Sequence, residues 1–264
     1  MIWLAVQLPI AAIMTAAGIL AFRRSIRLAT GLVAAMLALI LLKATVNHIP
    51  AAEARLFPWD WYPFVEGWWF LLPAMFIFGV GIRVVRRSVW KRDGLMVGAG
   101  LLLVYCGALG LAMAKPHGLT GRIDDKGVCH QTSGYSCSAA SAVMLLHQAG
   151  IPATEQEMAE LCVTRAGSTR VSGTSECGMM RGLRQKMAGR GRPVISAPAV
   201  DRIPAPAMVG ILINPQLSHS ILVTSVEPDQ VKVIDPLYGR GSIPRGQFER
   251  TWKGVAIHLE RSGS

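Results

Sequence analysis

Long apolar runs fill the first part of this 264-residue chain and constrain its fold more than any other feature. Each run is about 20 residues long and would extend roughly 30 Å as a helix, which is the thickness of the hydrocarbon core of a bilayer. The sequence therefore predicts a membrane region of four helical spans over residues 1–114. The predicted spans are residues 2–22, 28–46, 67–84 and 95–114.

The first run is predicted to be a retained span and not a signal peptide. A signal peptide carries positive charge before its apolar core, whereas Arg23, Arg24 and Arg27 come after this one. The chain carries a formal net charge of +11, but part of the excess sits in short basic clusters between the apolar runs. Membrane topology explains clusters in that position, so we expect lipid and not nucleic acid as a partner.

A polar, glycine-containing linker at residues 115–124 is predicted to join the membrane region to a folded domain at residues 125–264. About 140 residues suffice for one compact core. The domain begins with helical patterns and ends with strand patterns, the order expected of an α+β fold. One helix is opened by a capping box at Thr154 and runs to about residue 163, and another covers residues 178–188 after a Gly- and Ser-rich loop. Strands are predicted at residues 194–196, 208–213, 217–226, 231–236 and 255–259.

A glutamine and a cysteine six positions apart, Gln131 and Cys137, stand near the start of this domain. Residues 138–149 have an apolar helical face and end at Gly150, which predicts a helix with Ser136 as its N-cap and Cys137 in its first turn. Unpaired backbone N–H groups and the helix dipole favour a thiolate there. A thiolate beside an amide donor is half of a cysteine acyl-transfer site.

His219 and Asp235 supply the other half of the predicted site. The histidine opens the strand at residues 217–226, and the aspartate ends the next strand at residues 231–236. A regular antiparallel hairpin would pair residue 222 with Asp235 and place His219 near the same open end. An aspartate there can hold the imidazole tautomer while the other ring nitrogen serves the thiol.

These residues resemble the bacteriocin-processing cysteine peptidases, which have a papain-like fold and cut leader peptides after a double glycine. The resemblance rests on the Gln–Cys spacing, the order Cys, His, Asp and the 16-residue interval from His219 to Asp235. The resemblance also includes the residues that follow His219, residues 234–236 with Gly239, and the closing residues 248–254. Altogether the resemblance covers roughly residues 125–260.

The resemblance implies a peptide or protein substrate, no cofactor and no metal. It implies that Cys137 is the nucleophile, His219 the acid–base residue, Asp235 its orienting partner and Gln131 an oxyanion donor. Two residues depart from the family pattern: Ser136 and Ser138 flank the cysteine where the family usually has Asp and Gly, which bears on substrate preference. Many relatives are fused to a peptide-exporting ABC transporter, so an exporter would here be a separate partner.

Two other classes of function remain open from the sequence. The order Cys–His–Asp also suits a papain-like acyltransferase or a cell-wall peptide hydrolase. Some relatives have lost the cysteine and only hold peptides, but Cys137 argues against such a catalytically silent binding module.

The remaining cysteines of the domain, Cys129, Cys162 and Cys177, allow either a disulfide or free structural thiols. No CxxC motif is present, so a zinc site is not expected.

Basic residues predict that the catalytic domain faces away from the cytoplasm. The first and third loops between the spans carry the arginines and lysines, whereas the second, at residues 47–66, carries only Arg55. Short basic loops stay in the cytoplasm. Four spans then place residues 115–264 outside, on the periplasmic side of a bacterial inner membrane.

Overall fold

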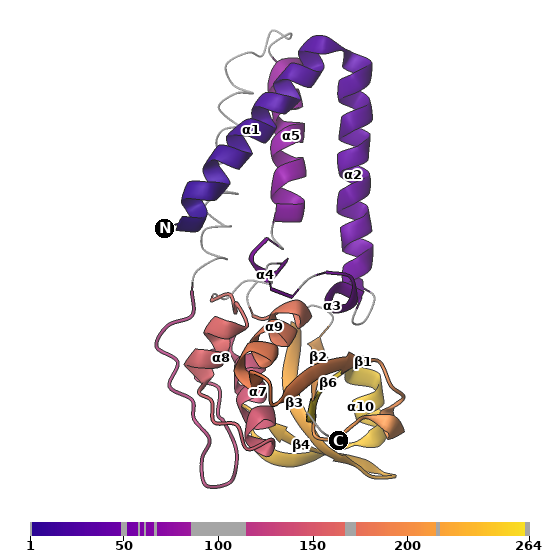
Figure 1. Cartoon of the computed structure of the whole chain (residues 1–264). Coiled ribbons are helices and arrows are strands. Elements are labelled where there is room, and N and C mark those ends of the chain that lie inside the picture. Colours follow the sequence, from indigo (N-terminus) through magenta and orange to yellow (C-terminus); the bar gives the residue numbers. More distant parts are fainter. Residues whose placement is uncertain are drawn as a thin grey trace. The chain divides into compact units, whose positions relative to one another are not determined.

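The computed structural model describes residues 2–48, 52–57, 59–60, 62–65, 68–85, 115–166, 173–214 and 217–261 (Figure 1). The chain divides into two compact units. A helical unit comprises Met1–His48 and Phe64–Leu111, and a second unit comprises Ile49–Pro63 and Ala112–Ser264. The four candidate site residues all belong to the second unit.

Three long helices form the described part of the helical unit. They are α1 (Ile2–Arg24), α2 (Ile26–His48) and α5 (Trp68–Val85), which coincide with the first three predicted spans. Gly18 and Gly79 let α1 and α5 pack backbone to backbone. A Cβ on Gly18 would lie 2.3 Å from the Phe76 carbonyl oxygen, and one on Gly79 would lie 2.1 Å from the Thr15 carbonyl oxygen. Small residues of this kind are typical of helix contacts in membranes.

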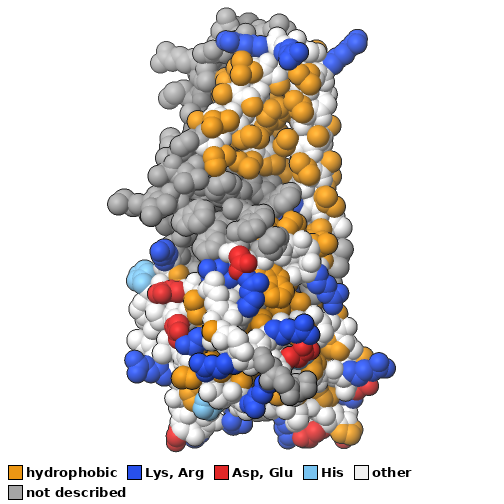
Figure 2. All heavy atoms as spheres, viewed as in Figure 1, with side chains coloured by type: hydrophobic (Ala, Val, Ile, Leu, Met, Phe, Trp, Pro, Cys, Tyr) orange, Lys and Arg blue, Asp and Glu red, His pale blue; other side chains and the backbone are white. Residues whose placement is uncertain are grey.

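One described helix is long and apolar enough to cross a membrane, over residues Ile26–Lys43 of α2. A shorter apolar stretch, Leu72–Ile82, lies in α5. Hydrophobic side chains cover the visible face of the helices in Figure 2, and basic side chains gather at one end of them. The fourth predicted span, at residues 95–114, lies outside the described residues.

The second unit combines helices with one antiparallel sheet. Its main helices are α7 (Cys137–Gln148), α8 (Glu155–Leu161), α9 (Glu176–Met187) and α10 (Arg245–Thr251). The six strands are β1 (Gly191–Ser196), β2 (Ala207–Asn214), β3 (Leu217–Val226), β4 (Gln230–Asp235), β5 (Gly239–Pro244) and β6 (Trp252–Arg261), in the order β1-β6-β2-β3-β4-β5. Helices α7, α8 and α9 lie on one side of the sheet and α10 on the other (Figure 1). This is the predicted α+β arrangement.

Strand β5 and helix α10 of the sheet domain have no counterpart in the sequence-based prediction. Strand β5 contains two glycines and a proline and lacks an apolar alternation, and α10 is only seven residues long. Both form because neighbours support them: β5 pairs with β4, and Phe248 of α10 is fully buried against the sheet. The helix α9 also begins at Glu176, earlier than residue 178, because the Ser175 hydroxyl accepts from the Gly178 N–H at 3.3 Å.

The pairing of β3 with β4 corrects the predicted hairpin register. Leu222 pairs with Ile234, and not with Asp235, because a bulge near Thr224 adds one residue to β3. Directly opposed residues of an antiparallel pair share a face of the sheet, and side chains alternate along each strand. The bulge therefore puts His219 and Asp235 on one face, whereas the regular register would have placed them on opposite faces.

The segment between α2 and α5 contains a buried tyrosine. Tyr62 is fully buried. Its ring stacks on Phe57 with centroids 4.2 Å apart, and its hydroxyl donates to Glu53 at 2.6 Å. Asp60 is exposed and forms an ion pair with Arg184 of α9.

Candidate active site

Cys137 is the first residue of α7, as its position after Ser136 predicts. Ser136 occupies the N-cap position, but its hydroxyl makes no capping hydrogen bond. It donates instead to the Ser133 carbonyl at 2.9 Å and accepts from the Ser133 N–H at 3.2 Å. The predicted capping role is therefore wrong: Ser136 closes the preceding turn, and the first-turn N–H groups keep no side-chain acceptor. Those N–H groups remain available to a negative charge at Cys137.

The start of α7 lies against an open edge of β3. Strand β4 ends at Asp235, so the part of β3 around Ser220 extends beyond its neighbour. The Ser141 hydroxyl of α7 donates to the Ser220 carbonyl at 3.0 Å. The Ser220 N–H and the Ser138 hydroxyl are hydrogen-bonded to the Cys137 sulfur. The unpaired edge of the sheet thus supplies a donor to the thiolate.

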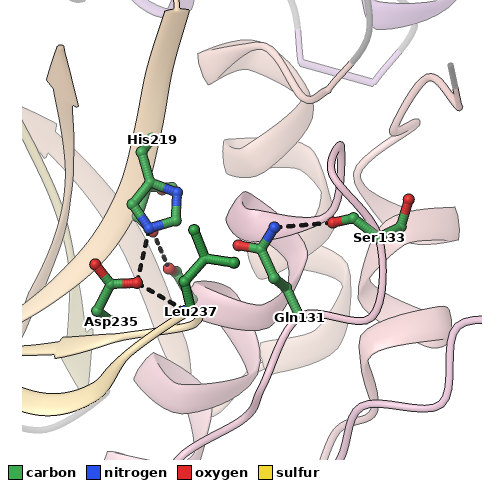
Figure 3. A network of polar contacts seen from close by, with 7 residues as sticks. Gln131, Ser133, His219, Asp235 and Leu237 are labelled. Carbon is green, nitrogen blue, oxygen red and sulfur yellow. Dashed lines mark hydrogen bonds and ion pairs between the residues drawn. The ribbon is translucent and has the colours of Figure 1, made fainter. Parts of the chain in front are cut away.

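His219 is almost fully buried and lies between the cysteine and the aspartate. Its Nε2 is 2.8 Å from Asp235 Oδ1 (Figure 3). An ionised carboxylate only accepts, so Nε2 carries the proton and Nδ1 is left to face the thiol. The Leu237 N–H also donates to Asp235 Oδ1, at 2.7 Å, and fixes the carboxylate. The structure therefore brings together the three residues Cys137, His219 and Asp235 in one hydrogen-bonded chain.

The electrostatics of this chain favour the thiolate–imidazolium form. Burial by itself would raise the pKa of Cys137, but hydrogen bonds from His219 and the Ser220 N–H lower it overall. Burial would likewise lower the pKa of His219, but its bonds to Asp235 and Cys137 raise it to about 9. Burial opposes ionisation of Asp235 too, yet the bond from His219 keeps its pKa below the ordinary value. The ionised form of each of these three residues is therefore stabilised by the hydrogen bond to its neighbour.

Gln131 lies on the segment that precedes α7, and its backbone N–H donates to the Pro236 carbonyl at 3.0 Å. Its side-chain Nε2 donates to the Ser133 carbonyl at 2.8 Å. The other end of the amide, Oε1, is buried without a hydrogen-bond partner among the described residues. In Figure 3 the amide nitrogen is turned toward Ser133. One of its two N–H groups is therefore already engaged, and the second is the one left for a ligand.

A small cavity of about 80 Å³ opens beside Cys137, between α9 and the sheet. Its lining includes His219, Met179, Met208 and Gly210. Thr174 from the Gly- and Ser-rich loop at residues 167–178 and Ser218 from β3 also line the cavity. Residues 167–172 of that loop lie outside the described residues.

The other described cysteines form no disulfide. Cys129, Cys162 and Cys177 are all buried, and the structure favours structural thiols over the disulfide that the sequence left open. Burial raises the pKa of both Cys129 and Cys162 to about 12. Among the four described cysteines, Cys137 is thus the one prepared to react.

The profile of the peptidase C39 family matches residues 125–264. This chain belongs to the peptidase C39 family. The family is one of cysteine peptidases, and the domain has its papain-like α+β fold. The resemblance to bacteriocin-processing peptidases is thereby confirmed.

Two curated proteins are similar to about half of this chain. An uncharacterized protein of Methanothermobacter marburgensis is 27% identical over 144 residues, which are 53% of this chain and 92% of that protein. One of Methanothermobacter thermautotrophicus is 26% identical over 139 residues, with the same shares of 53% and 92%.

Two solved structures are also similar. The peptidase domain of Streptococcus ComA, a bifunctional ABC transporter, has 18% identity and a TM-score of 0.43 and covers 56% of this chain and all of that domain. A double glycine motif protease from an AMS/PCAT transporter, solved with its leader peptide, has 16% identity and a TM-score of 0.44 and covers 54% of this chain and 94% of that one.

Proposed function

We propose that this C39 peptidase is a membrane-anchored cysteine endopeptidase that cleaves exported precursor peptides after Gly-Gly. One observation carries the catalytic part: the hydrogen-bonded chain from Cys137 through His219 to Asp235, with the thiol pKa lowered and the imidazole pKa raised. A buried histidine with both ring nitrogens engaged in this way suits proton transfer to and from a nucleophilic thiol.

The reaction follows from the positions of these groups. The Cys137 thiolate attacks the carbonyl carbon of the scissile peptide, and a C–S bond forms. His219 gives its proton to the departing amine as the C–N bond breaks, which leaves an acyl group on the sulfur. His219 next takes a proton from water, which attacks the acyl carbon and releases the thiolate. Asp235 holds the imidazole through both steps.

Two N–H groups are proposed to hold the oxyanion that forms in each step. One is the backbone N–H of Cys137 at the start of α7, which has no side-chain cap in front of it. The other is the second N–H of the Gln131 side chain, the first being bonded to the Ser133 carbonyl. Donors aimed at the developing charge typically account for the largest part of such catalysis.

The side chains beside Cys137 support glycine at the cleavage site. Met179 and Met208 line the cavity next to the thiol, so a substrate residue without a side chain avoids competing with them for space. Lys253 and Glu176 also line the cavity and form an ion pair there. The membrane part of the proposal rests on the apolar helix Ile26–Lys43 and on the sequence of the other predicted spans.

Cys137→Ala and His219→Ala test the catalytic proposal. Each is expected to reduce cleavage of a Gly-Gly precursor peptide by about 10⁴-fold or more, the scale for removing a nucleophile or its base. Cys162→Ala, at a buried thiol outside the site, is the matched control and should retain activity. Mass spectrometry should find an acyl adduct on Cys137 with Gly-Gly peptides and none with cell-wall peptides. Full activity of Cys137→Ala would refute the proposal, and adducts formed only by wall peptides would refute its substrate class.

Gln131→Ala tests the oxyanion donor separately. Loss of one such donor is expected to lower kcat by about 10²–10³-fold with little change in KM. An unchanged kcat would remove Gln131 from the site.

A further inference from the structure

Glu155 is a buried carboxylate that the proposed reaction does not use. It is the first residue of α8 and is 0% exposed. A carboxylate in such a position is costly unless hydrogen bonds replace its hydration. The hydrogen-bond donors to the Glu155 carboxylate therefore identify the segments that this residue holds in place.

Among the described residues, the three donors to this carboxylate come from the segment in front of α7. The Thr132 N–H donates to Glu155 Oε1 at 2.8 Å, and the Thr132 hydroxyl donates to Oε2 at 2.6 Å. The Gly121 N–H donates to Oε2 at 2.9 Å. The approach is so close that a Cβ on Gly121 would lie 2.6 Å from Oε2. Glu155 thus clamps the residue that directly follows Gln131.

The other side of Gln131 is fixed by the sheet. Its backbone N–H donates to the Pro236 carbonyl, and the neighbouring Asp235 is held by His219 and by the Leu237 N–H. Gln131 is therefore held between the Glu155 clamp on one side and the turn after the catalytic aspartate on the other. Its backbone has no freedom to move without breaking one of the two attachments.

We infer that Glu155 is a positioning residue, which sets the place of the Gln131 amide at the oxyanion site through its two bonds to Thr132. This inference rests on the proposed function, because it concerns a donor to the oxyanion. It makes Glu155 and Thr132 determinants of the chemical step although neither belongs to the hydrogen-bonded chain from Cys137 to Asp235. A displacement of about 1 Å at a catalytic group can cost up to 10²-fold in rate, so a measurable effect is expected.

The test compares a reagent that forms an oxyanion with one that does not, on the full chain in detergent. With acetyl-glycyl-glycinal, the Cys137 sulfur bonds to the aldehyde carbon, and the carbonyl oxygen takes the negative charge and then a proton from His219. With iodoacetamide, the thiolate displaces iodide and no oxyanion forms. Glu155→Gln puts an amide where the donors need an acceptor, and should raise Ki for the aldehyde about 10-fold. The rate of Cys137 alkylation should stay within about 2-fold of the parent rate, because alkylation needs no oxyanion donor.

Thr132 provides a second test that leaves the buried charge in place. Thr132→Ala should also raise Ki about 10-fold, whereas Thr132→Ser keeps the hydroxyl and should restore the parent value. Glu157→Gln, on the same helix but paired at the surface with Lys186, is the matched control and should leave Ki unchanged. In a Gln131→Ala background, Glu155→Gln should have no further effect on Ki, because it acts through the amide that is missing.

The outcomes separate this inference from the proposed function. Absence of aldehyde binding by the parent chain would refute the function itself. Aldehyde binding that is equally strong in Glu155→Gln and Thr132→Ala would refute the positioning role alone. Equal losses in Ki and in alkylation rate, or losses that add to that of Gln131→Ala, would show that Glu155 supports the fold and not the amide. If Glu155→Gln does not fold by circular dichroism, the comparison of Thr132→Ala with Thr132→Ser decides.

Discussion

At Cys137, burial and hydrogen bonding act on the thiol in opposite directions, and hydrogen bonding prevails. The same balance holds for His219, whose pKa rises to about 9. The two groups stabilise each other: the imidazolium donates to the thiolate, and the thiolate favours the imidazolium. The active form is therefore the ion pair, and it persists until the imidazolium loses its proton near pH 9.

Asp235→Asn tests how far the aspartate maintains that ion pair. The bond to the Asp235 carboxylate is the largest of the interactions that raise the pKa of His219, so its removal lowers that pKa. The alkaline limb of the pH profile of kcat/KM should then move from near pH 9 to lower pH. Activity at neutral pH should fall by less than about 10²-fold, because the amide oxygen still accepts from Nε2.

An alkaline limb that stays in place in Asp235→Asn would show that the carboxylate does not set the histidine pKa. Complete loss of activity in a folded variant would show that the Asp235 carboxylate does more than orient the imidazole ring and raise its pKa. Cleavage rates measured between pH 5 and pH 10, with circular dichroism as a check on folding, separate these results.

At the scale of elements, the β3–β4 hairpin decides whether the histidine and the aspartate meet. The bulge near Thr224 shifts the pairing by one residue, and because side chains alternate along a strand, this one residue changes the face on which His219 lies relative to Asp235. The Thr224 hydroxyl donates to the Lys232 carbonyl at 3.2 Å across the bulge. The bulge thus takes up one residue of β3, and the pairs between it and His219 keep the register that puts the histidine and the aspartate on one face.

Two single-residue deletions in β3 test this register. Deleting Thr224 removes the bulge but keeps Leu222 opposite Ile234, so His219 and Asp235 stay on one face and activity should fall by less than about 10-fold. The lost hydrogen bond should cost about 1 kcal/mol of stability. Deleting Ser220 instead turns His219 to the other face, and activity should fall by about 10³-fold or more. A folded Thr224-deletion variant without activity would contradict the observed register.

At the scale of the whole molecule, a peptidase domain shares its chain with apolar helices. The loop between α2 and α5 belongs to the peptidase unit, where Asp60 pairs with Arg184 and the Trp59 ring lies 5.4 Å from the Arg184 guanidinium. That loop carries few basic residues, whereas Arg23 and Arg24 end α1. Because the peptidase unit includes this loop, both are expected on the same side of the membrane, away from the basic loops.

Protease accessibility tests this sidedness. Protease added to intact spheroplasts is expected to digest the catalytic domain, because the basic loops keep the opposite ends of the helices in the cytoplasm. A cytoplasmic marker protein serves as the control for intact membranes. Protection of the domain until the cells are lysed would place it in the cytoplasm and would exclude the four-span topology.

Local patterns in the sequence determined much of this protein's structure and chemistry. The apolar face of residues 138–149 predicted the helix behind Cys137, and the spacing of Gln131, Cys137, His219 and Asp235 pointed to the C39 family. These features can be read from the sequence because helix periodicity depends on residues that are near one another in the chain. The order and spacing of the site residues are likewise visible in the chain itself. The roles of those four residues remain predictions, but three of them do meet in space.

The tertiary structure alone decided how these residues meet. It introduced the bulge at Thr224, bonded the Ser136 hydroxyl to Ser133 in place of a cap, and buried the Glu155 carboxylate. The burial of Glu155 depends on donors from Thr132, which lies outside the helix that Glu155 begins, and the bulge includes a contact across the hairpin with Lys232. A residue's own propensity holds no information about such a partner, because the free energy comes from the packing of the two together.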